Sequence, residues 1–237
     1  MVTTFKKIEI PFVGHATIAT LCELARLNLY GLGRVGKNEV HMETLMGNLT
    51  MWTEVDYNGK VWAIMEGPEI RFVDYHLQRS KFAQTFGIPS DVITSGKKIL
   101  LDVGLNYVYA PIVSLEALGS LKFDFARVKK MLKGEKTVLF CFYTPQAFDN
   151  DSALHSRVIA PLIGFTEEDY FTGSTQAAVC SAARNQGLLD NTKTDYKVEQ
   201  GDFAGRSGRA RVIFDKSHKT PLVIATAAHV FSTEISF

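Results

Sequence analysis

Cysteine is scarce in this sequence, with only three residues among 237, at positions 22, 141 and 180. They are odd in number and far apart, and no Cys-x-x-Cys pair or Cys/His ligand spacing accompanies them. We therefore expect neither a disulfide framework nor a zinc site. Cys22 and Cys180 are predicted to be small buried side chains. Such sparing use of cysteine is typical of a reducing compartment, and we expect a cytoplasmic protein.

A long apolar run and an excess of charge of one sign are also missing. No apolar run is long enough to cross a bilayer. The first residues, Met-Val-Thr-Thr-Phe-Lys-Lys-Ile, do not have the charged leader and apolar core of a signal peptide. The net charge is +1, with lysine and arginine mixed among aspartate and glutamate. We therefore expect neither nucleic acid nor a membrane as a partner.

Apolar residues are present in the proportion that a folded core requires, at 46% against 22% charged residues. The length allows one large domain or two modest ones. Apolar periodicity, helix caps and turns such as Asn-Gly predict a mixed α and β chain. Strands are expected at 5–12, 40–45, 49–52, 61–65, 98–103, 107–111, 137–143, 153–159, 196–199, 209–214, 221–225 and 229–231, and helices at 15–28, 77–86, 114–120, 124–133 and 176–184.

One motif occurs twice. The chain contains Glu-Ile-Pro-Phe-Val-Gly-His-Ala-Thr at 9–17 and Glu-Asp-Tyr-Phe-Thr-Gly-Ser-Thr at 168–175. Both follow the pattern Glu-x-x-Phe-x-Gly-polar-small, and each leads into a helix-like stretch, which suggests two similar domains. Gly14 and Gly173 would lie at helix N-termini, where unpaired N–H groups and the helix dipole favour an anion. The pattern therefore predicts a carboxylate-binding site.

These motifs closely resemble the signatures of the phenazine-biosynthesis PhzF-like family. A third segment, Glu-Gln-Gly at 199–201 with Gly-Arg-Ser-Gly-Arg at 205–209, resembles a later segment of that family. The resemblance covers the chain from Phe5 to the last strands. It implies the fold of diaminopimelate epimerase, which is an α+β fold of two pseudo-symmetric halves. Each half would be a β-barrel-like sheet around a central helix, with the site between the halves.

The resemblance also implies how the chain is divided. We place the N-terminal half at 1–95 and the C-terminal half at 96–237, with the last strand able to cross back to the first half. Family members begin with a hairpin, a helix and a strand that carries the main catalytic glutamate, and all of these would precede Phe5. The first half is therefore expected to be incomplete. Its open sheet edge would need cover, so we expect self-association as a homodimer.

Specific roles follow from the same resemblance. Backbone donors at the helix ends hold the ligand's acidic group in the family, which implies Gly14, His15, Gly173 and Ser174 as substrate-binding residues. His15, Asp169 and Ser174 match the positions that shuttle protons at the reacting carbon, so they are the candidate catalytic residues. No metal and no organic cofactor are expected.

The true epimerase uses two opposed cysteines as its acid and base. The equivalent positions here are Val13 and Thr172, neither of which can serve. A thiol two-base racemisation is therefore not expected. Removal and return of one proton, which moves a double bond, is the alternative within the family, and a carboxylate in an apolar cleft can act as its base.

Each candidate also has a structural interpretation. His15 could be a general acid, or it could cap its helix or lie buried with a partner. Asp169 could relay a proton, or it could only form the turn before the second helix. Ser174 lacks a Gly-x-Ser-x-Gly context, which favours hydrogen bonding to an acidic ligand over a nucleophile. Glu9 and Glu168 are expected to brace the two turns. The other histidines show no ligand spacing.

The segment 205–209 is not a phosphate-binding loop, because the required lysine and hydroxyl are missing, and a tight turn between strands is the better interpretation. Arg157, Arg206 and Arg209 could still add positive charge near an anionic substrate.

Two functional hypotheses remain. The first is a PhzF-like isomerase or epimerase that moves a proton on a small anionic metabolite in a biosynthetic process. The second is a non-catalytic homologue that binds a small acid or a protein partner, having lost the segment with the catalytic glutamate.

Overall fold

The computed structural model describes residues 12–45 and 47–233, and it divides them into two units. The first unit contains the described residues up to Glu66 and those from Ile224 onward, and the second contains Gly67–Val223. Residues 67–95, expected in the first half, belong to the second unit. The reason is local pairing and packing: β4 (Phe72–Asp74) pairs with β5 (Leu100–Asp102), and α2 (Arg79–Phe86) packs into the core of that unit.

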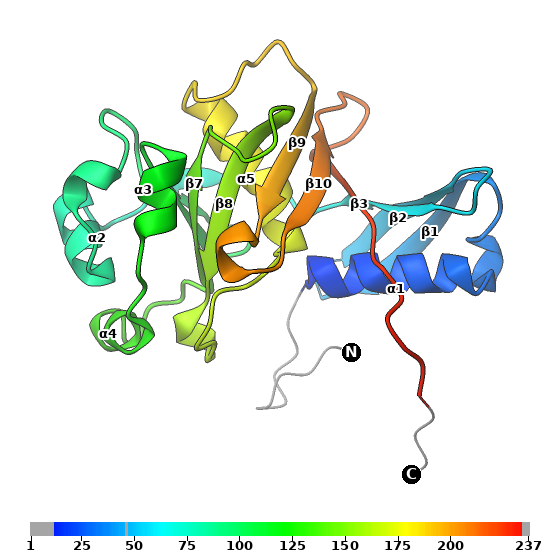
Figure 1. Cartoon of the computed structure of the whole chain (residues 1–237), viewed down its shortest axis with the longest axis horizontal. Helices are drawn as coiled ribbons and strands as arrows, with labels where there is room; N and C mark the ends of the chain where they lie inside the picture. Colours follow the sequence, from blue (N-terminus) through cyan, green and yellow to red (C-terminus); the bar gives the residue numbers. More distant parts are fainter. Residues whose placement is uncertain (1–11, 46, 234–237) are drawn as a thin grey trace. The chain divides into compact units, whose positions relative to one another are not determined.

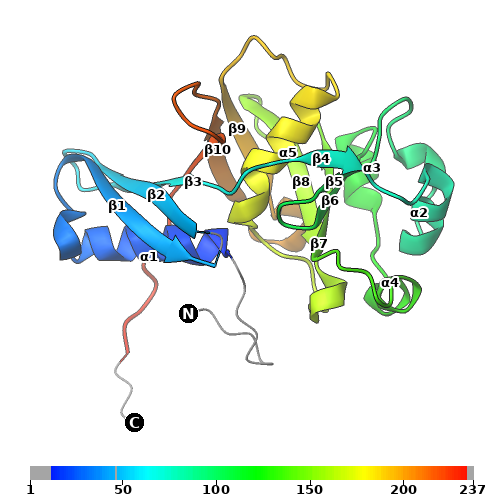
Figure 2. The same ribbon diagram turned by 180° about the vertical axis from the view of Figure 1, so that it is seen from behind.

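The first unit is a helix on a three-stranded antiparallel sheet. Helix α1 (Gly14–Arg26) packs against β2 (Gly47–Val55) and β3 (Val61–Glu66), while β1 (Gly36–Thr44) pairs with β2 (Figure 2). These three predicted strands are confirmed. The predicted strand at 5–12 lies outside the described residues, apart from Phe12, which is not in a strand.

The buried face of α1 does not extend to the residue after the helix. Leu21 and Ala25 are buried and Leu24 is half-buried, but Leu27 is 49% exposed. The helix ends at Arg26, so Leu27 is the C-cap and no longer follows the helical repeat.

The second unit is a seven-stranded mixed sheet in the order β10-β9-β8-β7-β6-β5-β4. The remaining strands are β6 (Tyr107–Pro111), β7 (Leu139–Thr144), β8 (Ser152–Ile159), β9 (Asp195–Gln200) and β10 (Gly208–Ile213). The pairs β6/β7 and β8/β9 are parallel and the other pairs are antiparallel. β4 was not predicted, and β11 (Leu222–Ala225) follows at the boundary between the units.

Helices cover both faces of this sheet (Figure 1). On one face α2, α3 (Leu115–Ser120) and α4 (Phe125–Met131) cover an apolar core rich in aromatic rings, in which Phe86 lies 4.8 Å from Phe140 between ring centroids. On the other face lies α5 (Gly173–Asn185), which contacts β6, β7 and β10. Because strand side chains alternate, Tyr107 and Tyr143 face α5 while their neighbours enter the aromatic core.

Short 3₁₀ turns complete the chain at Leu29–Gly31, Ser90–Val92, Pro161–Ile163 and Asp202–Ala204. The predicted strand at 229–231 is wrong: this segment has no strand structure, and Val230 and Phe231 are 84% and 75% exposed. Among the described residues, no helix is both long and apolar enough to cross a membrane.

The fold class is mixed α+β, with large sheet content and few helices. What the two units demonstrably share is a thirteen-residue helix that begins at the motif glycine, Gly14 in α1 and Gly173 in α5. The pseudo-symmetric pair of barrel-like halves stays a prediction.

Candidate active site

The first turn of α5 carries backbone donors that no side chain of the turn satisfies. Thr172 is its N-cap residue with extended backbone angles, and its side chain does not cap the helix. In the part of the chain that the structure describes, no acceptor is recorded for the backbone N–H groups of Gly173 and Ser174. The first turn therefore offers two donors at the positive end of the helix dipole, and an anion is the natural partner for them.

Asp169 organises the turn that leads into α5. Its Oδ1 accepts a hydrogen bond from the backbone N–H of Phe171 (3.2 Å), and its Oδ2 accepts one from the Thr172 hydroxyl (2.6 Å). Its own N–H donates to the carbonyl oxygen of Val158 on β8 (2.9 Å). Both carboxylate oxygens thus take part in an Asx-type turn, which fixes the side chain beside the helix end.

Two buried amides hold this turn against the sheet. Gln176 Nε2 donates to the carbonyl oxygen of Thr172 (3.0 Å) and to Gln200 Oε1 (2.9 Å). Gln200 Nε2 in turn donates to the carbonyl oxygen of Asp169 (2.8 Å). Both glutamines are fully buried. Gln176 was missed in the sequence, although a long polar side chain directly before the apolar run Ala-Ala-Val-Cys was a usable signal.

Ser174 has a partner that sequence reasoning also missed. Its Oγ lies 3.3 Å from the hydroxyl oxygen of Tyr107 on β6. Burial raises the pKa of Tyr107, and the Ser174 hydrogen bond opposes the rise only in part, so the phenol stays protonated. No imidazole or carboxylate contacts Ser174 among the described residues, so nothing there activates it as a nucleophile. Its geometry suits hydrogen bonding to a ligand.

The first motif forms the corresponding end of α1 in the first unit. Val13 is the N-cap with extended backbone angles, and no side chain caps the helix. Gly14 is buried and His15 is exposed, with no hydrogen-bond partner recorded within the described ranges. His15 therefore neither caps the helix nor lies buried. His15 lies in the first unit, while Asp169 and Ser174 lie together at one helix end in the second unit.

The arginines considered for substrate binding are engaged elsewhere. Arg157 is 7% exposed and forms a bidentate pair with Glu168, with a shortest distance of 2.6 Å. Its remaining nitrogen donates to the carbonyl oxygens of Leu118 (2.8 Å) and Leu121 (2.9 Å). The Arg206 guanidinium lies over the Tyr170 ring. Glu168 thus links the motif to β8, as its predicted bracing role requires.

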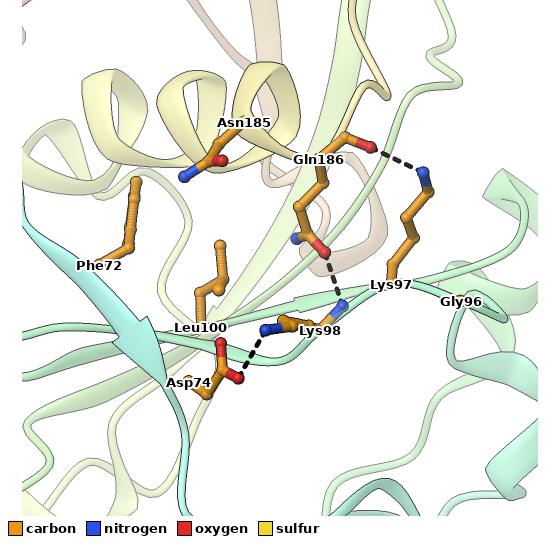
Figure 3. Close-up of a pocket in the computed structure, with 8 residues that line it drawn as sticks. All are labelled: Phe72, Asp74, Gly96, Lys97, Lys98, Leu100, Asn185 and Gln186. Atoms are coloured by element: carbon orange, nitrogen blue, oxygen red, sulfur yellow. Dashed lines mark hydrogen bonds and ion pairs between the residues drawn. The ribbon is translucent and has the colours of Figure 1, made fainter.

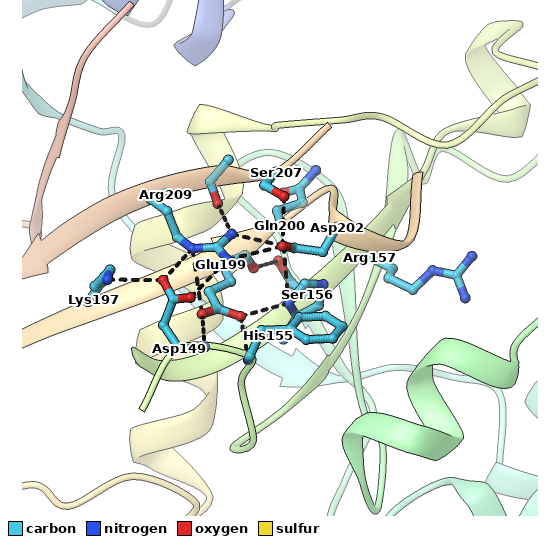
Figure 4. Close-up of polar contacts among 12 residues, drawn as sticks. Asp149, His155, Ser156, Arg157, Lys197, Glu199, Gln200, Asp202, Ser207 and Arg209 are labelled. Carbon is cyan, nitrogen blue, oxygen red and sulfur yellow. Dashed lines mark hydrogen bonds and ion pairs between the residues drawn. The ribbon is translucent and has the colours of Figure 1, made fainter. Parts of the chain in front are cut away.

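A second polar cluster lies beyond the motif, at the ends of β8 and β9 (Figure 4). It contains His155, Glu199, Asp202, Arg209 and Asp149. Glu199 and His155 are fully buried, and His155 Nδ1 lies 3.1 Å from Glu199 Oε2. The predicted turn at 205–209 is confirmed in part: residues 205–207 lie between β9 and β10, and Gly208 and Arg209 begin β10.

The donor atoms of His155, Glu199 and Asp202 lie within 4.8 Å of one another, which invites the question of a metal ion. The carboxylate oxygens of Glu199 and Asp202 already accept hydrogen bonds from the protein. Those of Glu199 accept from the N–H groups of Phe148 and Asp149 (both 2.8 Å), and Asp202 pairs with Arg209 at 2.8 Å. The guanidinium supplies the positive charge that a metal ion would bring, so the cluster fits a structural role better.

The groove drawn in Figure 3 lies at the other end of α5, beside Asn185 and Gln186. Its two lysines are engaged: Lys97 Nζ donates to the carbonyl oxygen of Gln186 (2.7 Å), and Lys98 Nζ pairs with Asp74 (2.7 Å). It does not include the motif residues.

A family model described as phenazine biosynthesis-like protein matches residues 5–232. An uncharacterized isomerase of Clostridium acetobutylicum is 27% identical over 236 residues, which cover 96% of this chain and 76% of that protein. An uncharacterized isomerase of Bacillus subtilis is 23% identical over 225 residues, covering 94% and 74%.

Solved structures show the same fold. A PhzF-family phenazine biosynthesis protein of Bacillus anthracis superposes with a TM-score of 0.76 at 20% identity, covering 97% of this chain and 77% of that one. A probable proline racemase of Agrobacterium radiobacter, solved with bound carbonate, gives 0.61 at 12% identity, covering 95% and 68%.

Proposed function

The chain belongs to the phenazine biosynthesis-like family, and from that premise we propose that it is an isomerase or epimerase that moves a proton on a small carboxylate-bearing metabolite. The relatives named above are called isomerases. The probable proline racemase was solved with carbonate, a small planar oxyanion whose oxygens accept hydrogen bonds as those of a carboxylate do. In this proposal the chain's own side chains carry the reaction, without a metal ion or organic cofactor.

The carboxylate of the substrate binds the end of α5. The N–H groups of Gly173 and Ser174 donate to it, and the helix dipole adds a favourable field. The Ser174 hydroxyl, oriented by Tyr107, donates a further hydrogen bond. By the echo of the motif, we assign Gly14 and His15 the same kind of role at the end of α1.

Proton transfer is assigned to Asp169 and His15. The hydrogen bonds from Phe171 and Thr172 fix the direction of the Asp169 carboxylate, which is what a positioned base requires. His15 is exposed and can serve as general acid. The helix caps Val13 and Thr172 carry no thiol, so a pair of opposed cysteines takes no part in the reaction.

The uncapped first turn of α5, with Asp169 and Ser174 beside it, is the observation that carries this proposal. To test it, small acids with an acidic C–H group next to a carboxylate are incubated with the protein in D₂O, and deuterium uptake is followed by NMR. Ser174→Ala should lower kcat/KM for exchange by about 10²-fold. Ser181→Ala is the matched control, since Ser181 lies on the same helix and donates only to Ala177 (2.8 Å). Equal rates for the two variants would remove Ser174 from the site.

A second candidate is a non-catalytic homologue that binds a small acid. It is favoured by one observation: both oxygens of Asp169 already accept hydrogen bonds within their own turn. Calorimetry, which measures binding of the acid, together with the deuterium-uptake assay distinguishes the isomerase from the non-catalytic binder. Binding of an acid that depends on Ser174, with no deuterium uptake into any acid that binds, would support the binder and exclude the isomerase.

A further inference from the structure

A chain of hydrogen bonds runs through the buried side of the turn before α5, and its donors all point toward Asp169. Gln176 Nε2 donates to Gln200 Oε1 (2.9 Å), and Gln200 Nε2 donates to the hydroxyl oxygen of Thr172 (3.1 Å). The Thr172 hydroxyl then donates to Asp169 Oδ2 (2.6 Å). Gln176 and Gln200 are fully buried and Thr172 is 6% exposed, so solvent has little access to these bonds. The chain ends on the carboxylate to which proton transfer is assigned.

The direction of this chain is fixed by groups that can only accept. Gln176 Nε2 donates to the carbonyl oxygen of Thr172 (3.0 Å). Gln200 Nε2 donates to the carbonyl oxygen of Asp169 (2.8 Å). Turning either amide would therefore set its oxygen against a carbonyl oxygen. A carboxylate likewise accepts and does not donate, so the single hydroxyl proton of Thr172 points at Asp169.

This arrangement leaves a buried acceptor without a partner. Gln176 Oε1 has no hydrogen-bond partner among the residues that the structure describes. Rotating the amide to reach one would lose the bond to Thr172 and bring two oxygens together. Unsatisfied buried groups are rare in folded proteins, and a role in catalysis is one of the explanations for them. The direction of the chain is thus maintained although its first member stays unsatisfied.

The bond from Thr172 controls the orientation of the Asp169 carboxylate. It is short, as charge-assisted O–H···O bonds are, whereas the N–H of Phe171 meets Oδ1 at 3.2 Å. Rotation of an aspartate carboxylate about its last torsion is soft, so its plane follows the donors that meet it. A general base must direct its oxygen at the C–H bond that it attacks. The Thr172 hydroxyl therefore decides how well Asp169 is aimed.

We propose that Gln200 is a positioning residue for the reaction: it fixes the Thr172 hydroxyl, which holds the Asp169 carboxylate in the orientation that accepts the proton. The proposal rests on the proposed function, in which Asp169 is the base. Gln200 lies on β9 and, within the described ranges, bonds to the backbone oxygen of Asp169 but not to its carboxylate. Its influence on the base passes through Thr172.

Carboxyl NMR tests this relay without any substrate. The side-chain carboxyl carbon of Asp169 is assigned in ¹³C-aspartate-labelled protein by its loss in Asp169→Asn. Thr172→Val, which removes the hydroxyl at nearly constant shape, should shift this resonance, and so should Gln200→Met. In the Thr172→Val background, Gln200→Met should add no further shift, because the path is already broken. A resonance that Gln200→Met leaves in place, or shifts equally in both backgrounds, overturns the proposal.

A second measurement covers the case in which Gln200→Met does not fold. The two Nε2 protons of Gln200 are followed by ¹⁵N NMR in the wild type and in Thr172→Val. The proton donated to Thr172 should move, while the one donated to the carbonyl oxygen of Asp169 should move much less. Equal movement of both protons, or of neither, would contradict the relay.

Deuterium uptake tests the consequence for the reaction, with but-3-enoate as the probe, because its reacting C–H group lies between a carboxylate and a double bond. Thr172→Val and Gln200→Met should each lower kcat about tenfold and leave binding of the acid unchanged. Thr172→Ser, which keeps the hydroxyl, should retain the rate. A role in packing alone would give the opposite order, since valine keeps the methyl group and serine does not.

The matched control is Thr85→Val. Thr85 is also buried, but its hydroxyl donates to the carbonyl oxygen of Lys81 (2.8 Å) on α2. This variant should leave both the uptake and the Asp169 resonance unchanged. Uptake by the wild type at a rate that Thr172→Val does not alter overturns this proposal alone. No uptake by the wild type removes the proposed function, and with it the base that Gln200 would position.

Discussion

His155 is a fully buried histidine, and its pKa is lowered in the folded protein. Burial lowers its pKa, and this outweighs the opposing hydrogen bond to Glu199. Its Nε2 has no acceptor among the described residues and Arg209 is nearby, so a charged imidazolium would leave a buried N–H unpaired beside a second positive charge. At Glu199, burial alone would raise the pKa, but the N–H groups of Phe148 and Asp149 outweigh it and lower the pKa.

These directions predict acid destabilisation in two steps. His155 takes up its proton at lower pH in the folded chain than in the unfolded chain, where the pKa is about 6.5, so the free energy of unfolding should fall as the pH drops below that value. Glu199 contributes stability above its unfolded pKa of about 4.3 and loses it as the pH falls through its lower folded pKa. Urea unfolding from pH 8 to pH 3.5 measures both. His155→Asn should lose only the upper step; an unchanged profile between pH ~6.5 and 5 would contradict the assignment.

Gly201 is a position that only glycine can occupy. It adopts φ +96°, and a Cβ atom there would collide with the backbone oxygens of Arg206 and Tyr170. Gly205 has φ +83° but open space around it. Gly201→Ala should therefore cost more than about 3 kcal/mol of unfolding free energy, and Gly205→Ala about 1 kcal/mol. Equal losses in urea unfolding would show that the collision is relieved by movement of the turn.

The turn before α5 is attached to β8 by a buried ion pair as well as by the hydrogen bond between Asp169 and Val158. Arg157 satisfies Glu168 and two carbonyl oxygens at once, which the single ammonium of a lysine cannot do. Arg157→Lys should lower the unfolding free energy by about 2–4 kcal/mol. Arg211→Lys, at an exposed pair with Asp195, should change it by less than about 0.5 kcal/mol. Similar losses for both variants would mean that the buried pair has no special role.

Helices and strands follow from local signals, which explains what could be predicted at this scale. Ser114 and Asp124 cap α3 and α4 as their side chains suggest, accepting from the N–H groups of Ala117 and Arg127 at 3.0 and 2.9 Å. β4 was missed because a strand of three residues is too short to show the alternation of apolar and polar side chains that predicts a strand. The segment 229–231 was wrongly predicted as a strand because apolar residues there lack a pairing partner.

At the scale of the whole molecule, the motifs locate the candidate site but not its supporting contacts. Gly173, Ser174 and Asp169 lie together because they are close in sequence. Tyr107 and Gln200 reach them from strands far away in the chain, 67 residues from Ser174 and 31 from Asp169. Sheet order and register decide such contacts, and local sequence does not encode them. The division at Glu66 depends on long-range pairing in the same way.

The most direct measurement is deuterium uptake from D₂O at the carbon next to the carboxylate of an acid that the wild-type protein binds. The account predicts uptake by the wild type and its loss, by about 10²-fold or more, in Asp169→Asn, with binding of the acid retained through the α5 end. An acid that binds at this helix end, yet gains no deuterium with the wild-type protein, would contradict the account.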